Sequence, residues 1–339
     1  MDIKVGLIGK GNVGTCFLEL LKKKEKYLEN KYGLKLTLIA IFEYDGALIN
    51  ENGLNIQEII ELNEDFRKLN DWKGNLKAID YISNLGLDVC IDTTPTNPDT
   101  GEPAFSHIIK AINSQIDIIS SSKGPFYLKY KEIHDLAKRE KVYIKYEATV
   151  ASCVPALSIK DSLIGNEIIS IKAILNGTSN YILSRMSSEG VAFSVALKEA
   201  QELGYAEADP TLDIEGYDAA GKLVILANDL LNWSKTIKDV KIKGISKITP
   251  HTIELAKSEG LVIKHLAIAE NNTLIVEPRL IEKDSPLNIG GTLNVIEFQT
   301  KFAGPIIIMG RGAGGYEAAS AILNDLINIQ KLRQNIVLH

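Results

Sequence analysis

A glycine-rich loop directly after an apolar segment is the feature that most constrains how this chain can fold. Residues 3–8 read IKVGLI and are followed by GKGNVG, in which Gly9, Gly11 and Gly14 keep the spacing G-x-G-x-x-G. A helical pattern begins at once, so the segment predicts a strand, a tight turn and a helix. In this context the spacing is typical of a loop that binds the pyrophosphate of a dinucleotide. The alternative is a tight strand-to-helix turn that holds no ligand.

Each glycine of this loop has its own predicted role. Gly9 permits the tight turn, Gly11 lets the backbone approach the pyrophosphate, and Gly14 lets the helix and the strand pack closely. Asn12 and Val13 open the helix, and its N-terminus faces the phosphates. All five residues are therefore candidates for binding the cofactor.

The choice of coenzyme depends on the end of the second predicted strand, at 36–42. Glu43 follows this strand and is the predicted acceptor for the adenosine ribose hydroxyls, the alternative being a solvated loop acid. It lies further from the glycines than the usual ~20 residues because a long helix intervenes. No Arg or Lys occurs within 42–50 to take a 2′-phosphate, so the sequence favours NAD over NADP.

Apolar segments and helical patterns alternate in the first part of the chain and change in the second. Strands are predicted at 3–8, 36–42, 87–92, 116–120 and 142–145, and helices at 13–30, 56–69, 103–113 and 129–139. Later strands are predicted at 168–175, 261–270, 273–280 and 292–300, with turns at Asn271-Asn272 and Gly290-Gly291. The pattern predicts an α/β protein. We expect a Rossmann-type parallel-sheet nucleotide-binding domain at 1–145, rejoined by 305–339, followed by an α+β domain with a mixed sheet at 146–304.

Composition argues against several classes of function. The net charge is −5 and no basic stripe occurs, which argues against nucleic acid as a partner. No apolar stretch reaches the roughly 18–20 residues of a membrane span. The 3 cysteines and 5 histidines lack the spacing of a metal site or a disulfide framework. We expect no secretory signal, because the predicted first strand follows Met1 directly. The sequence therefore predicts a cytoplasmic protein.

Two polar stretches follow strands of the predicted parallel sheet, at the edge where such sheets bind ligands. The first, DTTPTNPDTGEP at 92–103, offers Thr93 and Thr94 to a nicotinamide ribose. The second, IISSSKGPF at 118–126, holds Lys123 on a rigid turn, from which it could serve as a cation or a proton donor. The alternatives are a polar loop and an ordinary surface lysine.

A third stretch, ELGYAEADPTLDIEGYDAAGK at 202–222, is dense in acids and ends on a lysine. Asp218 and Lys222 are four residues apart, so they share one face of a predicted helix. The apolar run LVILA follows, so this helix is largely buried and desolvation opposes the charge of the lysine. A lysine so placed can pass a proton to or from a reacting oxygen. The alternative is an ordinary salt bridge worth ~0.2–0.5 kcal/mol.

This third stretch and NGTSNYIL at 176–183 resemble homoserine dehydrogenases closely, and TPTNPDTGEP and YEATVASCVPAL add to a resemblance over nearly the whole chain. The resemblance implies the reversible oxidation of L-homoserine to L-aspartate-4-semialdehyde with NAD or NADP. In cells the reaction would run toward homoserine, for threonine, methionine and isoleucine biosynthesis. The resemblance also implies that the domain at 146–304 is the catalytic and dimerisation domain, with a homodimer formed through the middle sheet.

The same resemblance implies roles for individual residues. Lys222 would be the acid/base lysine on the substrate oxygen, and Lys123 a second active-site lysine beside the cofactor. Asp218 and Asp213 would position the substrate and the lysine, and Glu207 would bind the homoserine amino group. Gly177 and Thr178 would line the pocket beside the nicotinamide. Gly314 would meet the nicotinamide end of the cofactor.

Members of the family often hold a sodium ion at a turn that corresponds to Glu147, Val150, Ser152 and Val154, mostly through backbone oxygens. This turn reads VASCVP here, with Ala-Ser-Cys where the family has small glycines. A second departure is Ser122, where the family has Asn before the lysine. The chain leaves no room for a regulatory ACT domain or a fused aspartate kinase, so threonine feedback through such a domain is not expected.

Two other functions are compatible with the same loop. A non-catalytic NAD-sensing regulator would bind the coenzyme without turnover, but it would need neither the paired lysines nor the acid cluster. A dehydrogenase of another amino acid, such as aspartate, would need a second cation for the side-chain carboxylate, where GYAEADPTLD offers acids. The sequence therefore favours a homoserine dehydrogenase.

Overall fold

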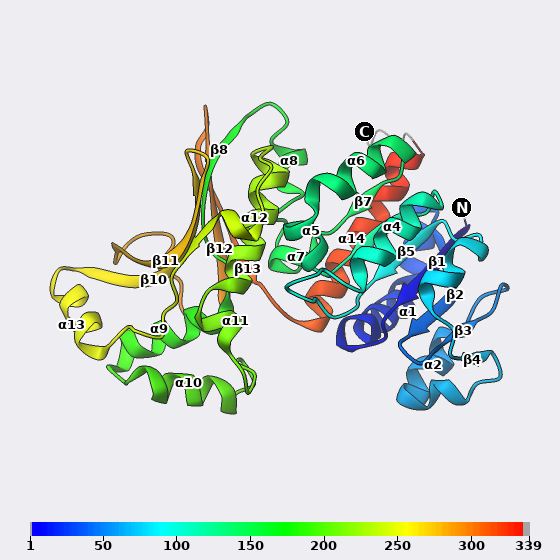
Figure 1. Cartoon of the computed structure of the whole chain (residues 1–339), viewed down its shortest axis with the longest axis horizontal. Helices are drawn as coiled ribbons and strands as arrows, with labels where there is room; N and C mark the ends of the chain where they lie inside the picture. The colour runs from blue at the N-terminus through cyan, green and yellow to red at the C-terminus, as the bar shows by residue number, and fades with distance from the viewer. Residues whose placement is uncertain (1, 335–339) are drawn as a thin grey trace. The chain divides into compact units, whose positions relative to one another are not determined.

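Two compact units make up the part of the chain that the structure, a computed structural model, describes: residues 2–334. The first unit takes in the N-terminal part through Thr149 and resumes at Gly314, and the second unit lies between them. The red C-terminal helix α14 packs beside the blue helix α1 in the first unit (Figure 1). The chain therefore leaves its first unit and comes back to it.

A seven-stranded sheet is the centre of the first unit, in the order β4-β3-β2-β1-β5-β6-β7. The strands are β1 (Asp2–Ile8), β2 (Lys35–Glu43), β3 (Gly46–Ile49), β4 (Trp72–Gly74), β5 (Val89–Asp92), β6 (Asp117–Ser120) and β7 (Ile144–Lys145). Adjacent strands along β2-β1-β5-β6-β7 run parallel, as predicted. The strands β3 and β4 extend this sheet on one side as antiparallel additions that were not predicted. The order reverses at β1, which is where open parallel sheets bind ligands.

Most helices of the first unit lie where the sequence predicts them. The helices are α1 (Asn12–Tyr32), α2 (Ile56–Leu62), α3 (Ala78–Tyr81), α4 (Ala104–Asn113), α5 (Gly124–Leu128), α6 (Tyr130–Glu140) and α14 (Gly315–Arg333), and a 3₁₀ turn, η1 (Asn63–Lys68), follows α2. However, α3 and α5 were not predicted, and the helix predicted at 56–69 ends at Leu62 and continues as a 3₁₀ turn. Phe17 and Leu18 of α1 pack with Val5 and Leu7 of β1 in one apolar core. Burial of these side chains fixes α1 to the sheet and so fixes the glycine loop between them.

A six-stranded mixed sheet forms the second unit, in the order β13-β12-β8-β10-β11-β9. Its strands are β8 (Ile168–Ile174), β9 (Val240–Ile242), β10 (Leu261–Glu270), β11 (Thr273–Glu282), β12 (Leu293–Thr300) and β13 (Gly304–Arg311). Its helices are α8 (Ile159–Ser162), α9 (Gly177–Glu189), α10 (Phe193–Glu202), α11 (Thr211–Ile214), α12 (Tyr217–Leu230) and α13 (Pro250–Ser258), and α7 (Ala148–Ala151) lies at the boundary. The predicted fold class, a parallel-sheet domain followed by a mixed-sheet domain, is confirmed.

Two predicted turns in this sheet had different outcomes. Asn271 and Asn272 join β10 to β11 with φ of 49° and 58°, values typical of a two-residue hairpin. Gly290-Gly291 does not join neighbouring strands, because β12 pairs with β8 and β13 instead of β11. The final strand also differs from the prediction that 305–339 rejoins the first domain. β13 pairs with β12, so the return begins at Gly314.

Candidate active site

The glycine loop has the geometry of an open phosphate cradle. Gly9 has a φ of +90°, and its N–H donates to the Phe42 carbonyl at 2.8 Å. A Cβ on Gly14 would collide with the Gly9 carbonyl, so this position requires glycine for packing. A Cβ on Gly11 would meet nothing within 4 Å, so the loop is open on that side. The residues present therefore fit a bound pyrophosphate at the N-terminus of α1.

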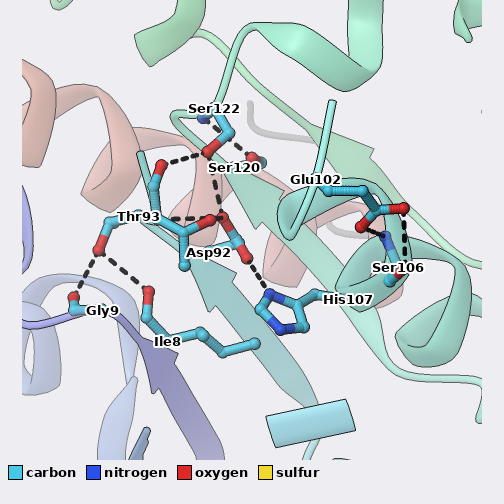
Figure 2. Close-up of polar contacts among 10 residues, drawn as sticks. Ile8, Gly9, Asp92, Thr93, Glu102, Ser106, His107, Ser120 and Ser122 are labelled. Carbon is cyan, nitrogen blue, oxygen red and sulfur yellow. Dashed lines mark hydrogen bonds and ion pairs between the residues drawn. The ribbon is translucent and has the colours of Figure 1, made fainter. Parts of the chain in front are cut away.

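A buried hydrogen-bond network holds the carboxyl end of β5 beside this loop (Figure 2). The Asp92 carboxylate is fully buried, pairs with His107 Nδ1 at 2.7 Å and accepts from Thr94 Oγ1 at 2.7 Å. Thr93 Oγ1 donates to the Gly9 carbonyl at 2.6 Å. Thr93 and Thr94 are therefore fixed next to the glycine loop, the first by its carbonyl and the second by Asp92.

The same network extends to the turn that carries Lys123. Ser122 Oγ donates to the Thr94 carbonyl at 2.5 Å and lies 3.2 Å from Asp92 Oδ1 (Figure 2). The Lys123 N–H donates to Thr96 Oγ1 at 3.1 Å, just before α5 begins. Two loops that are distant in sequence are thus bonded together, and Lys123 is held on their shared edge. The sequence did not identify His107 or Ser122 as part of this site.

Glu43 lies at the end of β2, as predicted, and has basic neighbours that the sequence did not reveal. Its carboxylate accepts from the Lys10 backbone N–H, within the glycine loop. Arg67, from the 3₁₀ turn η1, places Nη2 3.9 Å from Glu43 Oε2 and Nε 3.0 Å from Asp45 Oδ2. The search for basic residues within 42–50 did not include Arg67, which lies in η1. The chain folds back along the antiparallel strands β3 and β4, and this brings η1 to the end of β2.

Gly314 also belongs to the first unit and begins α14 with a φ of +136°. The next residue, Gly315, is so close to α1 that a Cβ there would lie 2.8 Å from Asn12 Oδ1. The Gly-rich segment therefore meets the first turn of α1, at the predicted cofactor loop.

In the second unit, Lys222 and Asp218 form a buried ion pair at the start of α12. Lys222 Nζ lies 2.7 Å from Asp218 Oδ2 and donates to the Leu175 carbonyl at 2.8 Å. The Lys222 residue is only 8% exposed, so this pair is far from an ordinary solvated salt bridge. Water screens the attraction between the Lys222 amine and the Asp218 carboxylate only weakly there, and the nearby carboxylate favours the charged form of the amine.

Asn176 joins this pair to a second carboxylate. Its Nδ2 donates to Asp213 Oδ1 at 2.6 Å and to Asp218 Oδ2 at 3.0 Å, while its Oδ1 caps α9 by accepting from the Ser179 N–H at 2.8 Å. Burial raises the pKa of Asp213, and the negative charge of Asp218 adds to this effect. Asn176 was missed as a site residue, although it lies inside the NGTSNYIL motif.

The other predicted substrate residues surround these groups to different degrees. Thr178 is buried, and its Oγ1 donates to the Tyr205 carbonyl at 2.6 Å. Gly177 lies against the Thr292 backbone, where a Cβ would come within 2.7 Å of the carbonyl oxygen. Glu207 is exposed, and its backbone carbonyl accepts from Gln201. Glu207 is therefore not part of the buried acid cluster.

The predicted sodium-binding segment bends sharply. Glu147 is buried and its N–H donates to Asp325 Oδ2 at 2.9 Å in the first unit. Further along, Ser152 has a φ of +52°, and the Val154 carbonyl accepts from the Ala156 N–H at 2.6 Å. Within residues 2–334, His, Cys, Asp and Glu side chains form no group of three that could hold a metal ion. This finding does not bear on a site made of backbone oxygens.

Comparisons with known proteins identify the family. The model of the homoserine dehydrogenase family matches residues 155–327. A homoserine dehydrogenase from Methanocaldococcus jannaschii is 46% identical over 333 residues, which cover 97% of this chain and 98% of the relative. This chain belongs to the homoserine dehydrogenase family. The resemblance stated from its motifs is thereby confirmed.

Two further homoserine dehydrogenases bear on the coenzyme. One, from Pseudomonas canavaninivorans, is described as NAD(+)-dependent and is 34% identical over 341 residues, covering 97% of each chain. The other, a hyperthermophilic archaeal enzyme solved in complex with NADPH, shares the fold with a TM-score of 0.84 at 24% identity, covering 99% of each chain. The coenzyme named for the first relative is thus NAD⁺, and the second, whose likeness shows the fold, was solved with NADPH.

Proposed function

We propose that this chain catalyses the reversible, NAD(P)-dependent interconversion of L-homoserine and L-aspartate-4-semialdehyde. In cells the direction would be toward homoserine, for threonine, methionine and isoleucine biosynthesis. The observation that carries the proposal is the buried Lys222–Asp218 pair, which Asn176 joins to Asp213. Neither a coenzyme sensor nor a structural protein needs a desolvated lysine within a cluster of acids.

Lys222 has the chemistry of a proton carrier for the substrate oxygen. During oxidation it would take the proton of the homoserine hydroxyl, and during reduction it would return a proton to the aldehyde oxygen. Asp218 would keep the amine oriented, and Asp213 with the exposed Glu207 would attract the α-ammonium group. When bound, the nicotinamide cofactor supplies the hydride chemistry. The open glycine loop with Thr93, Thr94, Lys123 and Gly314 would hold that cofactor.

The first test is turnover. We expect reduction of NAD⁺ or NADP⁺, followed by absorbance, with L-homoserine and not with L-aspartate. Binding of coenzyme without homoserine-dependent turnover would contradict the proposal and favour the sensor.

A substitution tests the role of Lys222. Lys222→Ala is expected to lower kcat by about 10²-fold or more, because the proton carrier is lost. Coenzyme affinity, measured by calorimetry, should stay unchanged. Lys241→Ala, at an exposed lysine of β9, is the matched control and should keep full activity. A near-normal kcat for Lys222→Ala would refute this role.

Sodium is a further part of the proposal. The support is a buried Glu147 followed by a sharply bent segment through Val150, Ser152 and Val154, whose backbone oxygens suit a hard cation. Activity measured against NaCl, with choline chloride at equal ionic strength, would distinguish a specific ion from general screening. Equal activity in both salts would refute the sodium site.

We also propose a homodimer and a cytoplasmic location. Ile307 and Met309 are exposed on β13, an edge strand of the second sheet, which suits contact with a second copy. Sedimentation of the native chain and of Met309→Lys would test the dimer.

No helix within residues 2–334 has the length and apolar content to cross a membrane. Cys16, Cys90 and Cys153 are unpaired, which suits a reducing compartment, and cell fractionation would test the location.

A further inference from the structure

Four charged residues gather at the carboxyl ends of β1 and β2 in the first unit. Lys10 lies within the glycine loop, Glu43 ends β2, and Asp45 follows it. Arg67 reaches them from η1, bonding Asp45 through Nε at 3.0 and 3.3 Å and facing Glu43 at 3.9 Å. Two cations and two carboxylates therefore balance at the position where a dinucleotide fold holds the adenosine ribose.

These charges are partly withdrawn from water. The Glu43 side chain is 15% exposed and that of Arg67 is 30% exposed. Burial lowers the pKa of Lys10, the charge of Glu43 opposes this, and the charge of Arg67 adds to it. The Lys10 amine bonds the Asn63 carbonyl at 3.1 Å and lies 4.8 Å from the ring centre of Phe66. Interactions among these groups are thus stronger than in bulk water.

The two coenzymes make opposite demands on this position. The ribose hydroxyls of NAD are best met by an ionised acceptor such as Glu43. The 2′-phosphate of NADP carries up to two negative charges, so it needs a cation and is repelled by a carboxylate. A phosphate bound beside Glu43 Oε2 would lie close to Arg67, because Nη2 of Arg67 is 3.9 Å from that oxygen.

We propose that Arg67 determines the choice between NAD and NADP. Bonded to Asp45 and facing Glu43, it is neutralised by two carboxylates, and this arrangement favours NAD. When a neutral side chain replaces Glu43, the guanidinium of Arg67 becomes the ligand of a 2′-phosphate. This inference rests on the proposed function only in assuming that the glycine loop binds a nicotinamide dinucleotide.

Calorimetric binding of NAD⁺ and NADP⁺ to the full chain tests the inference without turnover. The native chain should bind NAD⁺ about 10-fold more tightly than NADP⁺, as one close like-charge contact predicts. Glu43→Gln keeps an acceptor for the Lys10 N–H but removes the charge, so it should reverse the preference. Adding Arg67→Gln to Glu43→Gln should abolish the gain in NADP⁺ affinity. Glu64→Gln, an acid of the same 3₁₀ turn, is the matched charge control and should not reverse the preference.

The outcomes separate clearly. A gain in NADP⁺ affinity that depends on Arg67 and weakens with added salt supports the inference. An equal gain in the double variant, or tighter NADP⁺ binding by Arg67→Gln alone, overturns it. Binding of neither coenzyme would overturn both this inference and the proposed function. Arg67-dependent binding without homoserine turnover would overturn the proposed function alone.

Discussion

Lys264 is a buried lysine whose hydrogen-bond partners are all neutral. Its amine donates to Asn180 Oδ1 at 3.1 Å, to Ser184 Oγ at 3.3 Å and to the Ile289 carbonyl. Burial lowers its pKa to about 8. The unfolded chain therefore binds more protons at this site between about pH 8 and 10.4, so the free energy of unfolding should rise with pH over that range.

The variant Lys264→Met should remove this pH dependence. Burial of the charged amine lowers the free energy of unfolding below about pH 8 by about 3 kcal/mol, and the variant would not carry this penalty. Urea unfolding of the native chain and the variant at pH 7.5 and 10 measures the difference. Lys241→Met, at an exposed lysine, is the control and should keep the native pH dependence. Equal slopes for the native chain and Lys264→Met would contradict the expectation.

At the scale of elements, the glycine loop makes two separable predictions. Gly14→Ala places a Cβ against the Gly9 carbonyl, so it should lower the melting temperature and coenzyme affinity together. Gly11→Ala meets no protein atom within 4 Å, so it should fold normally and bind NAD⁺ at least about 10-fold more weakly, because the added methyl group occupies the pyrophosphate position. Calorimetry and thermal unfolding on both variants check this. Unchanged NAD⁺ affinity in Gly11→Ala would show that the loop is only a tight turn.

The start of α9 combines a helix cap with the acid cluster. Asn176→Ala removes the cap, which should cost about 1 kcal/mol of stability. It also removes a hydrogen bond that lowers the pKa of Asp213, so that pKa should rise and the acidic limb of kcat/KM should move to higher pH. Thr249→Ala removes a similar cap from α13, away from these acids, and should lower stability without moving the pH profile. If the pH profiles of kcat/KM coincide for the native chain and Asn176→Ala, Asn176 does not set the pKa of Asp213.

At the scale of the whole molecule, the two units divide the predicted binding tasks. The cofactor residues lie in the first unit, and the Lys222 cluster lies in the second. Hydrogen exchange should therefore show protection by NAD⁺ alone at 9–14, and protection by homoserine alone at 176–178 and 217–222. Homoserine protection confined to the first unit would contradict this division.

Local patterns in the sequence determined the parts of this protein that depend on near neighbours. The glycine spacing after β1 predicted the loop, and the spacing of Asp218 and Lys222 predicted their pairing, because residues four apart on a helix must share a face. The helix and strand periods likewise predicted most elements of both sheets. These features follow from backbone geometry, which acts over a few residues.

Only the tertiary structure decided contacts between distant segments. Arg67 meets Glu43 because β3 and β4 fold back onto β2, and Asn176 bridges two acids that follow it by 37 and 42 residues. In the same way β12 pairs with β8, although β11 precedes it in the chain. Strand order and register result from burying the whole apolar surface at once. No short window of sequence contains that information, so the contact between Arg67 and Glu43 and the bridge made by Asn176 were found only in the fold.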